Sequence, residues 1–139
     1  GITLDTLRRA RGVPVTVDDL KALTEAQARE IYLTRYVRKP GFDRIADPQL
    51  RTLMVDAGVH QGPERALAWL QRACGVTPDG VFGPVTERAV NELSPRMLRA
   101  KVTAARARAY GRLITDHPTQ ATFAAGWANR LAEFIEDLA

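Results

Sequence analysis

Signals that begin and end helices recur along the whole chain of 139 residues, and they constrain its fold more than any other feature. Three prolines follow residues that commonly precede a helix, at Asp47-Pro48, Gly83-Pro84 and Ser94-Pro95. Thr24 and Gln27 have the spacing of a capping box, which satisfies free amides at a helix start. Gly12 follows a helical stretch, where a left-handed glycine ends a helix. These start and stop signals predict short helices joined by tight turns.

The apolar spacing between these signals predicts an all-α fold. The expected helices cover residues 4–11, a short stretch opening at 16–19, and 24–36, 48–60, 64–74, 84–93, 95–115 and 126–138. The helix at 48–60 has apolar residues on most of its sides, which is typical of a buried central helix. At most a small β-turn or hairpin is expected near residues 76–82, around Asp79-Gly80.

Composition and charge set the broad class of the protein. Apolar residues make up 45% of the chain and charged residues 26%, which is ordinary for a globular domain. The net charge of +4 attracts polyanions, so nucleic acid, anionic lipid and anionic cell-wall polymers all qualify as partners. No apolar run approaches the ~20 residues that a membrane span needs, and none is predicted.

Residues that commonly bind metals or act as nucleophiles are scarce. His60 and His117 are the only histidines and Cys74 is the only cysteine, so the chain has no zinc motif and no internal disulfide. Cys74 lies in an apolar helical stretch and is expected to be a buried thiol. Ser94 precedes Pro95 and is expected to cap a helix. We therefore predict neither a metal nor an organic cofactor.

Asp56 and His60 stand out because they interrupt the apolar helix at 48–60. They are four residues apart, so they share one face of that helix. A buried carboxylate and imidazole must be hydrogen-bonded, because leaving either group unpaired costs several kcal/mol. The pair either cross-links neighbouring helices or lines a cleft, and the spacing alone leaves both interpretations open.

The stretch from Leu93 to Thr115 is a basic helix without any acidic residue. Its cations are Arg96, Arg99, Lys101, Arg106, Arg108 and Arg112. Such a helix could follow a phosphate backbone. It could equally present a solvated outer face, with long aliphatic stems lying on the core. We favour the outer face, because the charges are spread around the helix and no DNA-recognition motif accompanies them.

The most distinctive string runs from Asp79 to Thr86, where geometry alone predicts a tight turn and a Gly-Pro helix start. With other stretches it resembles glycoside hydrolase family 108, the muramidases also described as secretion activator proteins, and the predicted peptidoglycan-binding part that follows them. The matching stretches are Gly1-Ile2-Thr3, Leu23-Thr24 to Ala28, Ile31-Tyr32, Arg35-Tyr36, residues 56–63, Leu70-Gln71, residues 79–84 with Thr86, and Gly126-Trp127 with Arg130. Val37 and His60 depart from the family pattern, which commonly has an aromatic residue and an asparagine there.

This resemblance implies a lysozyme-like, all-α protein that cleaves the bond between N-acetylmuramic acid and N-acetylglucosamine in peptidoglycan. It implies that Thr3, Tyr36, Asp56 and His60 line the substrate cleft. The family's catalytic glutamate lies in a Glu-Gly-Gly motif upstream of Gly-Ile-Thr, so the catalytic residue is unknown within this chain. The chain is therefore expected to be N-terminally truncated and inactive alone.

Residues 1–62 are then expected to be the remainder of the catalytic region. Residues 63–139 are expected to be the predicted peptidoglycan-binding part, packed on it as one compact unit. The expected partner is the glycan strand, in the periplasm or cell wall of a bacterium, with phage or prophage origin an option. The chain itself shows no targeting signal, and its oligomeric state stays open.

The alternative function is a non-catalytic module that binds peptidoglycan or takes part in secretion. Nucleic-acid binding is the third and least favoured hypothesis.

Overall fold

The computed structural model describes residues 2–139, and every regular element in that range is helical. The helices are α1 (Leu4–Arg11), α2 (Val17–Lys21), α3 (Glu25–Leu33), α4 (Pro48–Gln61), α5 (Pro63–Cys74), α6 (Pro84–Glu92), α7 (Pro95–Asp116) and α8 (Ala124–Glu136). Shorter turns are the π-helical η1 (Thr34–Arg38) and the 3-10 segments η2 (Phe42–Arg44) and η3 (Pro118–Phe123). These bounds confirm the all-α prediction. Gly1, the first residue of the Gly1-Ile2-Thr3 stretch, lies outside the described residues.

The predicted capping residues begin their helices as expected. The Asp47 side chain accepts from the Leu50 amide at 2.7 Å, with Pro48 at the start of α4. Thr24 and Gln27 form both bonds of the capping box, at 3.0 and 3.2 Å. Because these contacts are local, the sequence alone was sufficient to place the helix starts.

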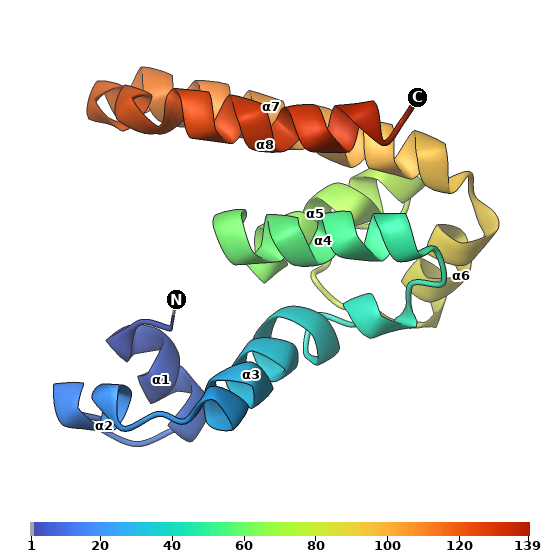
Figure 1. Cartoon of the computed structure of the whole chain (residues 1–139). Coiled ribbons are helices and arrows are strands. Elements are labelled where there is room, and N and C mark those ends of the chain that lie inside the picture. Colours follow the sequence, from blue (N-terminus) through green and yellow to red (C-terminus); the bar gives the residue numbers. More distant parts are fainter. Residues whose placement is uncertain (1) are drawn as a thin grey trace.

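The helices are arranged in tiers (Figure 1). α1 to α3 lie together at one end, α4 and α5 form an antiparallel pair in the middle, and α7 and α8 form a long antiparallel pair above them. α4 packs against α5, and both pack against α7. None of the described helices combines the length and the apolar character that a membrane crossing requires.

The main core is built around α4, which confirms its prediction as a buried central helix. Leu50, Leu53, Met54 and Ala57 of this helix are fully buried. The cluster continues on both sides of Gly62 through Phe42, Ile45, Ala66, Leu67, Leu70, Ala73, Phe82, Val90, Leu98 and Val102. Residues 42–57 and residues 66–102 therefore contribute to the same apolar core.

Cys74 at the end of α5 is half-buried at the edge of this core, less than the full burial expected from the sequence. Burial raises the pKa of its thiol to about 11, and the nearby charge of Lys101 only partly opposes this. The thiol is thus protonated at neutral pH, as suits a packing residue.

The segment between α5 and α6 is a turn held by a buried glutamine and has no strand. The Gln71 side chain is fully buried. Its Nε2 faces Asp79 Oδ1 at 2.9 Å and the Val81 carbonyl at 3.0 Å, and its Oε1 accepts from the Gly80 amide at 3.1 Å. Gly80 has a φ of 76°, as the Asp-Gly pair predicted.

The third helix ends differently from its prediction. The α-helix stops at Leu33, and the chain continues to Arg38 as a π-helical turn, in which the Lys39 amide donates to the Thr34 carbonyl at 2.9 Å. Pro40 has no amide hydrogen, so it cannot extend the α-helical pattern. This wider turn leads into the buried Gly41, which touches the turn before α6.

Gly41 is expected to be the most sensitive glycine of the fold. It has a φ of 82°, and a Cβ atom there would lie 2.6 Å from Cβ of Phe82. Gly41→Ala should therefore lower the free energy of unfolding by about 3 kcal/mol, from left-handed strain and overpacking. Gly12→Ala is the control, because Gly12 has a φ of 68° with open space around it, and it should cost about 1 kcal/mol. Equal losses in urea unfolding would contradict the predicted clash.

Candidate functional site

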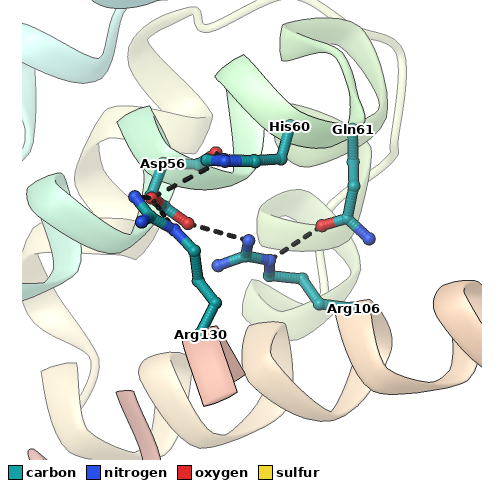
Figure 2. A network of polar contacts seen from close by, with 5 residues as sticks. All are labelled: Asp56, His60, Gln61, Arg106 and Arg130. Atoms are coloured by element: carbon teal, nitrogen blue, oxygen red, sulfur yellow. Dashed lines mark hydrogen bonds and ion pairs between the residues drawn. The ribbon is translucent and has the colours of Figure 1, made fainter. Parts of the chain in front are cut away.

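Asp56 is the centre of a polar network inside the fold (Figure 2). Its side chain is only 6% exposed. Arg106 of α7 donates from Nη2 to Asp56 Oδ2 at 2.8 Å, and Arg130 of α8 donates from Nε to Oδ1 at 2.7 Å and from Nη2 to the same oxygen. The carboxylate thereby joins α4 to both helices of the α7–α8 pair.

Arg106 is the most deeply buried charge in the network. Its side chain has no exposed surface, although it lies in the basic helix recognised from sequence. Its Nε donates to Gln61 Oε1 at 2.7 Å, and its guanidinium lies 5.4 Å from the centre of the Phe134 ring. A buried guanidinium needs such partners, because desolvation of an unpaired charge is very costly.

The two arginines decide the charge of Asp56. Burial alone would raise the pKa of its carboxyl group, but the hydrogen bonds and charges of Arg130 and Arg106 outweigh burial, and the pKa is lowered. His60 contributes in the same direction. Asp56 is therefore a stable carboxylate at neutral pH and holds no proton to donate.

His60 follows Asp56 on the same face of α4, as the spacing predicted. Its Nδ1 donates to the main-chain carbonyl of Asp56 at 2.9 Å and lies 3.7 Å from Asp56 Oδ1. Its side chain is 36% exposed. The ring is thus oriented by the buried network while part of it faces solvent.

Tyr32 of α3 and Tyr36 of the π-helical turn form an aromatic pair. The rings of Tyr32 and Tyr36 are 5.0 Å apart and tilted by 56°. Burial, the Asp56 charge and Tyr36 raise the pKa of Tyr32, and Arg130 opposes them. Tyr32 therefore lies within electrostatic range of the Asp56–Arg130 pair, and the exposed part of its ring is available for contact.

The fourth expected cleft residue, Thr3, begins the first helix. The Thr3 hydroxyl accepts from the Thr6 amide at 3.1 Å and lies 2.9 Å from the Thr6 hydroxyl, so it caps α1. Among the described residues, no hydrogen bond or ion pair joins Thr3 to Tyr36, Asp56 or His60. The network instead includes Gln61, Arg106 and Arg130.

Arg106 and Arg130 could have been suspected from the sequence only in part. One face of α7 carries Arg99, Arg106 and Tyr110, which are spaced by seven and four residues. This spacing is typical of a buried helix face, but it is noticed only if arginine is accepted as a buried residue. Nothing local distinguishes Arg106 from the exposed Arg108. Among residues 2–139, no group of His, Cys, Asp and Glu side chains is arranged to hold a metal ion.

Comparisons with known proteins show which families the chain resembles. Residues 1–62 match the family model described as Glycosyl hydrolase 108, and residues 65–132 match the model described as Predicted Peptidoglycan domain. The chain is similar to the solved structure titled "Structure of Brucella abortus SagA". The TM-score is 0.82 and the identity 31%, over 99% of this chain and 76% of that chain. No curated protein matches it.

Replacing Arg106 should destabilise the fold strongly. Arg106→Gln removes a partner of a buried carboxylate, which is expected to cost about 3 kcal/mol in the free energy of unfolding. The matched control is Arg108→Gln, on the same helix but exposed, which should change stability by less than about 0.5 kcal/mol. Urea unfolding of both variants measures the difference, and similar losses would show that Asp56 does not depend on Arg106.

Stability should also depend on pH through Asp56. Its pKa is lower in the folded protein than in the unfolded chain, so its contribution is complete above the unfolded value of about 4. That contribution should fall as the pH drops from about 4 through the folded-state pKa. In Asp56→Asn, the slope of unfolding free energy against pH in this range should be smaller than in the wild type. An unchanged slope would be evidence against the ion pair.

Proposed function

Because this chain belongs to the glycosyl hydrolase 108 family and its C-terminal helices match a predicted peptidoglycan domain, we propose that the protein is a muramidase. It would hydrolyse the bond between N-acetylmuramic acid and N-acetylglucosamine in the periplasm or cell wall. The observation that carries this proposal is the pair of adjoining matches, to a glycosidase family and to a peptidoglycan domain, in one chain.

The two matched segments are proposed to act together as one unit. α4 belongs to the first segment, and α5, α7 and α8 belong to the second. The apolar core crosses from one to the other, and Asp56 of α4 is paired with Arg106 and Arg130. A glycan strand held by the second segment would therefore stay at a constant position relative to α4.

We infer that Asp56 positions other groups and does not serve as the acid of the reaction. Glycosidic cleavage needs a carboxylic acid, commonly with a raised pKa, that protonates the leaving oxygen. The pKa of Asp56 is lowered, and both its oxygens accept hydrogen bonds from arginines. The family resemblance implies that a glutamate in a Glu-Gly-Gly segment supplies the proton. The 139 residues alone are then expected to be inactive.

The proposed substrate cleft lies beside this network. Tyr36 and the exposed part of Tyr32 offer aromatic faces to sugar rings, and His60 and Arg130 offer hydrogen-bond donors. The resemblance adds Thr3, whose hydroxyl would shape the cleft by holding the start of α1. Asp56 would hold the side chains of His60 and Arg130 in place through its contacts with both residues.

A non-catalytic module that binds peptidoglycan or takes part in secretion is the second candidate. The charge state of Asp56 favours it, because the one strongly buried carboxylate in the described chain stays ionised in its ion pairs and has no proton to donate. The two candidates differ in a single observable, which is the release of soluble fragments from peptidoglycan.

The deciding measurement is muropeptide release from purified peptidoglycan, read by mass spectrometry. We expect disaccharide-peptides from a protein extended upstream through a Glu-Gly-Gly segment, and none from the 139-residue chain. In the extended protein, Tyr36→Ala should lower kcat/KM about tenfold by removing a sugar contact. Val85→Ala is the control, because Val85 is exposed on α6, outside the proposed cleft. An extended protein that binds peptidoglycan but releases nothing would favour the binding module.

A further inference from the structure

A basic groove runs between α5 and α7. Two adjoining hollows of about 480 and 600 Å³ share Trp69 and Arg72 of α5. The cations that line them are Arg65 and Arg72 on α5 and Lys101, Arg108 and Arg112 on α7. Asp116 is the single carboxylate, at the end where α7 stops. We call this surface the α5–α7 groove.

The groove lies on a different side of α7 from Asp56. Lys101, Arg108 and Arg112 recur at spacings of seven and four residues, so they share one face of the helix. Arg99 and Arg106 lie on the face that packs against α4, where they reach Gln49, Asp56 and Gln61. The basic helix α7 therefore has two sets of cations, one that pairs with α4 inside the fold and one that lines the groove on the surface.

The groove cations lack acidic partners. Across residues 2–139, no carboxylate oxygen lies within 4.0 Å of the charged nitrogens of Arg65, Arg72, Lys101, Arg108 or Arg112. Elsewhere in the chain, arginines such as Arg9, Arg38 and Arg44 pair with nearby acids. A concave surface lined by unpaired charges of one sign focuses the field on a ligand of opposite charge.

The lining and the length of the groove fit an extended peptide. Between its charged rims the groove is lined by small residues, Ala68, Ala73, Ala100, Ala104, Ala105 and Ala109, around a nearly buried Trp69. From Lys101 to Arg112 the row of cations is about 16 Å long at the rise of an α-helix. An extended chain of about five residues covers that length.

We propose that the α5–α7 groove binds the stem peptide of peptidoglycan, a proposal that rests on the function proposed above. The free carboxylates of the stem peptide would pair with Arg72, Arg108 and Arg112, since a guanidinium binds a carboxylate through two parallel hydrogen bonds. Asp116 would accept from the amino group of a diamino acid in the same peptide. The alanine methyl groups would contact the small side chains of the stem.

A polyphosphate fits these features less well. Asp116 would repel a continuous row of phosphates, and Trp69 is too buried to stack on a base. Asp116 therefore distinguishes the two ligands by the sign of its effect. Its neutralisation should weaken the binding of a peptide that carries an amino group, and it should strengthen the binding of nucleic acid.

The test is co-sedimentation of the 139-residue chain with purified sacculi that contain diaminopimelate. A groove variant, Arg72→Gln with Arg108→Gln and Arg112→Gln, should bind about tenfold more weakly, because it loses three ion pairs. A control variant, Arg8→Gln with Lys21→Gln and Arg88→Gln, loses the same charge outside the groove and should bind as the wild type does.

Two further changes test the ligand chemistry. Asp116→Asn should weaken binding to sacculi. Amidation of the sacculus carboxylates should remove the difference in binding between the groove and control variants. Circular dichroism verifies that each variant is folded.

Two results would overturn the inference. Equal binding of the groove and control variants would exclude the groove as the contact surface, and muropeptide release by the extended protein would still decide the proposed function on its own. Stronger binding of Asp116→Asn, together with displacement of sacculi by DNA, would assign the groove to polyphosphates instead.

Discussion

The buried charge of Asp56 is the interaction on which the arrangement of the helices depends. A carboxylate that is 6% exposed requires compensation, and it receives this from Arg106 and Arg130 on two different helices. Hydrophobic contacts favour burial of α7 and α8 against α4, but they are not directional. The ion pairs specify which turn of each helix faces α4 (Figure 2), so they define the geometry of the surface beside His60.

The need to compensate buried charge also explains why the basic residues of α7 differ in their surroundings. Arg99 and Arg106 lie inside the fold, where Asp47 and Asp56 compensate their charges and Gln49 and Gln61 accept hydrogen bonds from them. The cations on the groove side have no such compensation and remain available to solvent and ligands. The groove therefore has a positive lining, with five cations and the single carboxylate of Asp116.

Local signals in the sequence were sufficient for most helix boundaries, since the Thr24 box and the Asp47 cap depend on residues within one turn. The pairing of Asp56 with His60 also followed from spacing. The partners Arg106 and Arg130 lie 50 and 74 residues away, and Arg106 and Arg108 differ only in the direction they face. The π-helical turn before Pro40 was missed, because it reflects how the chain must reach the buried Gly41.

A glycosidase of this kind has two physical tasks that favour opposite environments. Proton donation needs a carboxyl group whose neutral form is stabilised, and Asp56 is in the reverse situation because cations surround it. Holding an anionic polymer needs uncompensated positive charge, which the α5–α7 groove has on a different face of α7 from Asp56. Cations lower the pKa of any carboxyl group beside them and weaken it as a proton donor, as Arg106 and Arg130 do for Asp56. Because α7 turns Arg99 and Arg106 toward α4 and its other cations toward the groove, one helix carries both sets of charges on separate faces.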